Sequence, residues 1–295
     1  MLPFSSPVFI LLISSVGWGL TWLPLKYLAS QGMEGIYLIL IAFASAAVIL
    51  IPFTIRQWSC WQSHLHILLL IAFLGGFANI AFQTAIFHGD VIRVMILFYL
   101  LPAWSVIGGY LFLGEKIDPA RTLTVSASLL GAFLILGGPD IFETAPGWID
   151  LLAIASGFSF AMNNIAFRYA EQQPLTSKVN AVFVGCAMMA FAYIIISGTT
   201  TPEISSGNLT WSFLYGVVWL MLITYGTQWG VEQLEAGRAS VIIIMELVVA
   251  VISAAILLNE HLSTIELTGG ALVIFAAIIE TFRSQPVNIE ARENA

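Results

Sequence analysis

Residues 87–118 read FHGDVIRVMILFYLLPAWSVIGGYLFLGEKID, and residues 232–263 read EQLEAGRASVIIIMELVVAVISAAILLNEHLS. The second stretch repeats the pattern of the first, an acidic or amide residue near the start, an arginine, a long apolar run and a closing acid, at an offset of 145 positions. At this offset Arg93 aligns with Arg238. Internal duplication on this scale predicts two similar structural units within one chain.

The composition of the chain is strongly apolar. Of its 295 residues 59% are hydrophobic and 9% are charged, with a mean hydropathy of +0.94. A soluble protein of this length needs more charge on its surface. Apolar stretches of bilayer length follow one another with short polar breaks, which predicts an all-α integral membrane protein with ten transmembrane helices. The predicted spans are 7–29, 36–54, 65–87, 91–113, 120–138, 147–169, 178–197, 209–231, 237–258 and 264–282.

The basic residues predict the orientation of these spans. If the N-terminus lies in the cytoplasm, only Lys26 and Arg93 of the ten basic residues fall outside. Positive charge favours the cytoplasmic side, so we expect both termini there. The residues then placed inside are Arg56, Lys116, Arg121, Arg168, Lys178, Arg238, Arg283 and Arg292.

Five spans in each half is an odd number, so the second half enters the membrane in the opposite direction to the first. The sequence therefore predicts two inverted five-helix repeats, residues 1–140 and 141–284, followed by a cytoplasmic tail, residues 285–295. Inverted repeats are typical of secondary transporters, which alternate between two conformations around a central site. The net charge of −7 argues against a nucleic-acid partner.

Several short motifs, in order and at the repeat spacing, resemble the EamA group of the drug/metabolite transporter superfamily. The resemblance covers residues 8–282. The motifs are Trp18-Gly19 with Lys26, Leu101-Pro102 with Leu111-Phe112-Leu113-Gly114-Glu115, and Met245-Glu246 with Leu258-Asn259-Glu260. The resemblance implies an exporter or exchanger of amino acids or other small metabolites, working by alternating access in a bacterial inner membrane.

Two positions depart from the pattern of this group. Glu246 is followed by Leu247 where the group often has proline, which we expect to remove a kink from the ninth helix. Phe160 stands where tryptophan is common, so the lining of a cavity there would differ. The identity of the substrate is therefore not implied by the resemblance.

Glu246 is the strongest single indication of function. It lies near the middle of a span of roughly 22 residues, about 16 Å from each face at 1.5 Å per residue. Burying such a carboxylate costs about 2.5–3.5 kcal/mol, so it must face the bundle interior or a wet cavity. There it could couple a proton to transport, recognise a substrate ammonium, or serve as a structural hydrogen-bonding group.

Other candidates for substrate binding are polar and aromatic side chains at helical spacing. Asn79 and Gln83 lie one turn apart and share a face, and Tyr99 precedes the bend expected at Leu101-Pro102. Helix packing is the alternative role for the aromatic residues, as is a belt at the membrane surface. The predicted substrate-binding set is Trp18, Thr21, Trp22, Asn79, Gln83, Tyr99, Asn163, Asn164, Trp219, Tyr225 and Gln228, with Glu246 for coupling or ammonium binding.

Other functions fit the sequence less well. An intramembrane enzyme would need a nucleophile or a metal cluster at depth, but the four histidines lie at span edges. We therefore expect no catalytic residues, no metal and no cofactor. A phosphorylated substrate would need a deeply buried lysine or arginine to bind its phosphate. The basic residues lie no deeper than the ends of the predicted spans, so we do not expect such a substrate. We expect a monomer or weak homodimer that transports small metabolites. The alternatives are multidrug or cation efflux by proton antiport, a channel, and a membrane scaffold.

Overall fold

The computed structural model describes residues 6–33, 35–138, 145–201, 204–258 and 261–283. Within them every regular element is a helix. The predicted repeat boundary at residue 140, the motif Asn259-Glu260 and the tail 285–295 lie outside the described residues. The α-helices are α1 (Pro7–Gly19), α2 (Trp22–Ser30), α3 (Gly35–Arg56), α4 (Trp58–Trp61), α5 (Leu65–His88), α6 (Val91–Phe98), α7 (Leu101–Leu113), α8 (Pro119–Ile135), α9 (Trp148–Tyr169), α10 (Leu175–Ser197), α11 (Ser206–Leu214), α12 (Met221–Gln233), α13 (Ala236–Ile243), α14 (Met245–Leu258) and α15 (Thr264–Phe282), with a 3₁₀ turn η2 (Gln62–His64) and a π-helical segment η4 (Tyr215–Leu220).

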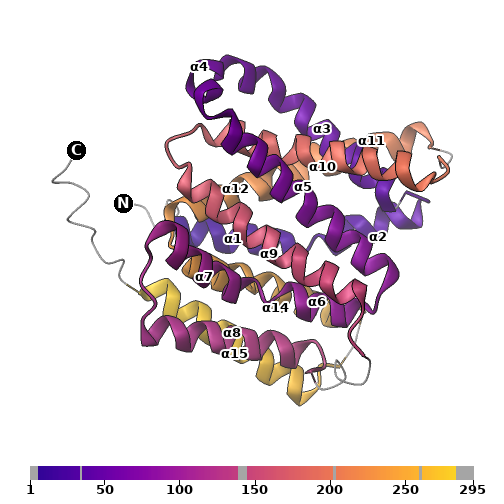
Figure 1. The fold of residues 1–295 in the computed structure, drawn as a ribbon. Helices are drawn as coiled ribbons and strands as arrows, with labels where there is room; N and C mark the ends of the chain where they lie inside the picture. The colour runs from indigo at the N-terminus through magenta and orange to yellow at the C-terminus, as the bar shows by residue number, and fades with distance from the viewer. Residues whose placement is uncertain (1–5, 34, 139–144, 202–203, 259–260, 284–295) are drawn as a thin grey trace.

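These helices form the membrane-spanning bundle that the sequence predicts. In the described part of the chain nine helical runs have the length and hydropathy to cross a bilayer, and α8 is a shorter apolar helix of 17 residues. α8 lies along α15 (Figure 1), so it occupies the place of a tenth span. The predicted fold class is confirmed as an all-α multi-pass membrane protein.

The packing of the helices repeats between the two halves. α1 packs on α12 as α9 packs on α5, and α1 packs on α13 and α14 as α9 packs on α6 and α7. α3 packs on α10, and α8 packs on α15, each helix meeting its own counterpart. Exchanging the halves leaves this set of contacts unchanged, which is the packing expected of a duplicated unit.

Two helix breaks occupy equivalent positions in the repeat. The first separates α6 from α7 at Tyr99–Leu100, and the second separates α13 from α14 at Ile244, 145 residues after Tyr99. The sequence-based expectation that a missing proline would remove the kink in the ninth helix is wrong. A tight turn, in which the Leu247 N–H donates to the Ile244 carbonyl at 2.9 Å, ends one helix and begins the next without proline.

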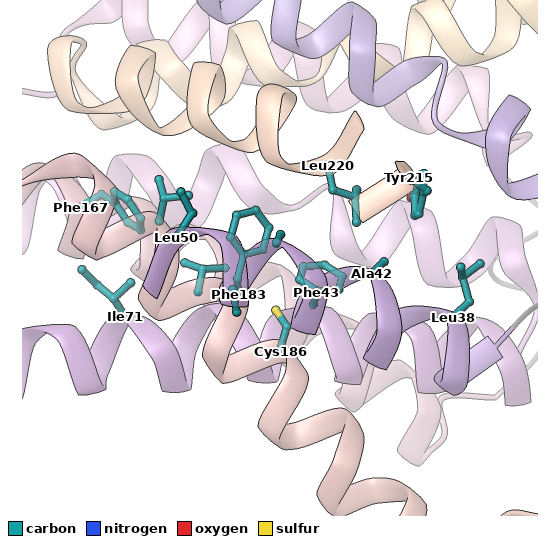
Figure 2. Close-up of a cluster of buried hydrophobic side chains, with 14 of the residues drawn as sticks. Leu38, Ala42, Phe43, Leu50, Ile71, Phe167, Phe183, Cys186, Tyr215 and Leu220 are labelled. Atoms are coloured by element: carbon teal, nitrogen blue, oxygen red, sulfur yellow. The ribbon is translucent and has the colours of Figure 1, made fainter. Parts of the chain in front are cut away.

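Apolar side chains fill the space between α3, α5, α9, α10 and η4 (Figure 2). Within this cluster the Phe43 and Phe183 rings lie 5.7 Å apart, and Ile71 is fully buried. The outer surface is also apolar, and Ile196 is 85% exposed. An outer surface of this kind is typical of a protein that contacts lipid, because a large exposed apolar area is unfavourable in water.

Glycines allow several of these helices to approach closely. A Cβ atom built on Gly185 would lie 1.9 Å from the Ala72 carbonyl oxygen, and one on Gly269 would lie 2.6 Å from the Gly131 oxygen. No side chain larger than hydrogen fits at these positions, as expected for close helix contacts in membranes. Gly270 has nothing within 4 Å of its Cβ position, so the pair Gly269-Gly270 packs through one residue only.

Candidate functional site

A cavity of about 630 Å³ lies at the centre of the bundle. Its walls come from α1, α2, α3, α5, α6, α9, α10, η4, α12, α13 and α14, which belong to both halves of the chain. This volume is in the range of sites that hold drug-sized molecules, about 300–1,000 Å³. The cavity is therefore large enough for a small organic solute.

Most of the predicted binding residues line this cavity. They are Trp18, Thr21, Trp22, Asn79, Gln83, Tyr99, Asn163, Gln228 and Glu246. Lining the cavity makes them available to a solute, and their role in binding one stays a prediction.

Three predicted residues lie behind the cavity wall. The Trp219 indole donates to the Thr21 hydroxyl at 3.0 Å, and the Asn164 side-chain oxygen accepts from Gln228 at 3.3 Å. The Tyr225 hydroxyl lies 2.5 Å from the Thr176 hydroxyl. These side chains hold their neighbours in place and do not border the cavity themselves.

Glu246 is held by the two equivalent helix breaks. It lies two residues after the break at Ile244, and the Tyr99 hydroxyl, at the other break, donates to Glu246 Oε1 at 3.1 Å. Gly19 brings α1 against the same place, since a Cβ atom built on it would lie 2.4 Å from the Glu246 carbonyl oxygen. The Trp18-Gly19 motif thus places an indole beside the carboxylate-bearing turn.

The two indoles of the first span are fixed by hydrogen bonds to other helices. Trp18 Nε1 donates to the Thr227 hydroxyl on α12, and Trp22 Nε1 donates to the Ser253 hydroxyl on α14, both at 3.0 Å. These bonds hold the ring positions in the cavity wall. They also use the N–H donors of both rings.

Several lining residues are not among those predicted from the sequence. Phe82 and Thr227 adjoin the predicted Gln83 and Gln228, and helical spacing with a wider stripe would have included them. Tyr215 belongs to the π-helical segment, which changes the helical phase, so spacing could not place it. Lys26 was noted as the end of the first span and lines the cavity mouth.

One end of the bundle is held together by ion pairs from loops and helix termini of both halves. We call it the ion-pair end, and the opposite end the Lys26 end. Pairs at the ion-pair end are Arg121–Glu235, Arg121–Glu280 at 3.3 Å, Arg168–Glu115 at 3.0 Å, Lys178–Glu232 at 2.6 Å, Arg283–Asp118 and Arg283–Glu280 at 3.5 Å. In the described part of the chain the Lys26 end has the pair Arg93–Asp150 at 2.6 Å.

Several of these charged groups are deeply buried. Arg121 is 3% exposed, and the side chains of Lys178 and Glu280 have no exposed surface. Lys178 Nζ also donates to the Phe167 and Ala170 carbonyls at 3.1 and 2.6 Å. Buried charges with this many partners fix the relative positions of the helices that carry them.

Glu115 joins three segments at the ion-pair end. Its carboxylate pairs with Arg168 on α9 and accepts from the Ala236 N–H, at the start of α13, at 3.0 Å. Burial raises the pKa of the Glu115 carboxyl above its ordinary value, while the Ala236 N–H and the Arg168 guanidinium act in the opposite direction. Glu115 thus joins the two halves of the chain at the ion-pair end.

The cavity reaches the Lys26 end and stops before the ion-pair end. Lys26, Ala29 and Gly35, around the loop between α2 and α3, form part of its lining. No residue of the ion pairs at the other end lines it. Gln228, which does line it, lies one helical turn before Glu232 of the Lys178 pair, so the ion pairs begin directly below the cavity floor.

Duplicated helices around a central cavity, with apolar surface toward lipid, define a multi-pass membrane protein of the transporter class. The chain belongs to the EamA-like transporter family, whose model matches residues 5–137 and 147–282. The resemblance inferred from the motifs is thereby confirmed, and the protein is a membrane transporter of the drug/metabolite type.

Similar proteins are known from bacteria. The uncharacterized transporter YojE of Bacillus subtilis is 24% identical over 214 residues, which cover 69% of this chain and 68% of YojE. An uncharacterized transporter of Clostridium kluyveri is 22% identical over 277 residues, 89% of each chain. A solved crystal structure matches 93% of this chain and 97% of its own with a TM-score of 0.75 and 16% identity, which supports the fold.

Proposed function

We propose that the protein carries a small amphipathic metabolite, an amino acid or an amine, across the membrane by alternating access. The observation that supports this most directly is a central cavity that reaches one end of the bundle and is separated from the other end by ion pairs. A carrier has this form in one of its two states, because a solute can enter from one side only.

The duplicated packing supplies the second state. Contacts of α1 with α12 and α14 correspond to contacts of α9 with α5 and α7, so a rearrangement that closes the Lys26 end and opens the ion-pair end would exchange the two sets of contacts. The two states would then have similar energies, because each uses the same kinds of helix packing. A small free-energy difference between states allows a bound solute to shift the equilibrium.

The basic residues suggest how the protein lies in the membrane. With the predicted cytoplasmic termini, the ion-pair end faces the cytoplasm and the cavity faces outward. The relatives in Bacillus and Clostridium favour a bacterial inner membrane. Export or exchange is the direction that the motif resemblance implies, and Glu246 is the group in the cavity best suited to couple a proton or bind an ammonium.

Counterflow in proteoliposomes tests the proposal. Vesicles containing the purified protein are loaded with a high concentration of unlabelled solute, and uptake of the same solute in labelled form is followed for a panel of amino acids and amines. A carrier produces transient accumulation of label above equilibrium, because exchange is faster than net flux. Passive equilibration of every solute without an overshoot would indicate a channel and overturn the proposal.

A further inference from the structure

The charged groups that line the cavity are separated along its depth. In the described lining these are Glu246 and Lys26. Gly19, at the end of α1, contacts the Glu246 backbone, and Lys26 lies seven residues later in α2, a rise of about 10 Å at 1.5 Å per residue. Lys26 is exposed, and its ammonium lies 5.8 Å from the Trp22 ring centroid. The inner part of the cavity is therefore negative, and the positive charge stays at the mouth.

The wall around Glu246 is rich in aromatic rings. A cation is attracted to the face of an aromatic ring, by about 0.5–2 kcal/mol depending on solvent exposure. The rings that line the cavity with the carboxylate include Trp18, Trp22, Phe82, Phe98, Tyr99 and Phe160. An acid surrounded by rings favours a positively charged organic group and gives an anion no comparable attraction.

Four of the donors that line the cavity are already bonded to protein. The Tyr99 hydroxyl donates to Glu246 itself, and the Trp18 and Trp22 indoles donate to hydroxyl groups on other helices. The Asn79 amide N–H donates to the Gly75 carbonyl at 2.9 Å. A carboxylate placed here would lie beside another carboxylate, while Lys26, the cation of the described lining, lies at the mouth.

From this distribution of charge we infer that the cavity selects a monocationic organic amine over the α-amino acid with the same side chain. The amine's ammonium pairs with Glu246, and its apolar part lies against the rings. In an α-amino acid the carboxylate is attached to the same carbon as the ammonium, so it cannot extend to Lys26 while the ammonium is at Glu246. The inference narrows the proposed substrate class, while binding itself can be measured whether or not transport occurs.

Three solutes with one aromatic ring test this inference. Isothermal titration of the purified full-length protein in detergent is carried out with 2-phenylethylamine, phenylalanine and 2-phenylethanol. The amine differs from the amino acid by the carboxylate and from the alcohol by the charge. Since a hydrogen bond to a charged group contributes about 1.5–3 kcal/mol, the amine should bind at least about tenfold more tightly than the other two. Equal or tighter binding of phenylalanine would overturn the inference.

Variants assign the preference to the carboxylate. Glu246→Gln keeps the shape of the side chain and should reduce the affinity for 2-phenylethylamine about tenfold or more, to that of the alcohol. Glu171→Gln, an exposed residue after the end of α9, is the matched control and should leave the preference unchanged. Retention of the full amine preference by folded Glu246→Gln protein would contradict the assignment.

A second variant guards against misfolding. Glu246→Asp retains the charge and should keep the order of the three solutes with weaker affinity, whereas loss of that order in folded protein would count against the inference. Amine-selective binding without counterflow would leave this inference standing and would remove the proposed transport function. Counterflow of phenylalanine in preference to the amine would overturn this inference and leave the proposed transport function standing.

Discussion

The Arg168 guanidinium lies 3.0 Å from the Glu115 carboxylate and thereby joins the end of α9, in the second half of the chain, to the loop after α7, in the first. The same carboxylate accepts from the Ala236 N–H, so one side chain connects three segments across the ion-pair end. On the proposed mechanism these contacts must break when that end opens. Their strength therefore helps to set the balance between the two states.

Removing the charge of Arg168 should favour opening of the ion-pair end. Arg168→Gln leaves the partly buried Glu115 carboxylate without its ion pair, which at partial exposure contributes about 1 kcal/mol. In a background lacking Cys60 and Cys186, a cysteine replacing the buried Leu234 should react with a maleimide about fivefold faster. An unchanged rate would mean that this pair does not restrain the closed end. Glu171→Gln serves as the control.

Mild acid should act on the Glu115 carboxyl and shift the balance in the opposite direction to the loss of Arg168. The pKa of Glu115 is raised in the closed state, so that state binds a proton more readily than one in which the carboxyl is hydrated. Lowering the pH through the pKa of Glu115 should therefore favour the closed ion-pair end. The other charged groups that act on this carboxyl are Arg168, Arg121 and Glu235. Spin-label distances across this end, measured between pH 7.5 and 5.5, should shorten in the wild type and shorten less in Glu115→Gln, in which the buried Glu232 at the same end can still bind a proton.

The buried pair of Lys178 and Glu232 should respond unequally to loss of its two members. Lys178→Met leaves the Glu232 carboxylate without its cation, and removing one partner of a buried pair costs about 3–5 kcal/mol. Glu232→Gln should cost less, since the Lys178 ammonium keeps the Phe167 and Ala170 carbonyls. Thermal unfolding in detergent measures both. Equal destabilisation by the two variants would show that the carbonyls do not stabilise the lysine.

Gly19 should tolerate no larger side chain. A methyl group there would lie 2.4 Å from the Glu246 carbonyl oxygen and 2.7 Å from Val249 Cβ, so α1 must move away from α14. We expect Gly19→Ala to destabilise the protein by about 1–3 kcal/mol and to weaken amine binding in the same cavity. Gly270→Ala, with open space at the Cβ position, should leave the melting temperature unchanged or raise it slightly. A neutral Gly19→Ala would contradict the close approach of α1.

The sequence predicted those features that depend on local pattern. Apolar runs identified the spans, and polar residues at helical spacing identified Asn79, Gln83 and Gln228, which line the cavity. The helix break at Ile244 was missed because only proline was considered as its cause. Ile244 lies 145 residues after Tyr99, so the repeat offset indicates a second break at this position.

Features that depend on packing could not be predicted. In the repeat alignment Glu246 corresponds to Leu101, yet its hydrogen-bond donor is Tyr99, and only the approach of the two helix breaks in the folded bundle brings them together. The π-helical segment brings Tyr215 into the wall and leaves Trp219 behind it. Basic residues at span ends suggested an orientation, while most of their acidic partners lie in loops and helix ends that are distant in the sequence.

Two spin-label distances in proteoliposomes test alternating access most directly. One pair of labels, at Lys116 and Gln172, spans the ion-pair end, and another, at Ser30 and Val91, spans the Lys26 end; all four positions are exposed. Conditions that change the state of the protein, such as adding 2-phenylethylamine or replacing Arg168 with glutamine, should lengthen one distance while shortening the other. Distances that stay constant, or that lengthen together at both ends, would contradict an alternating carrier.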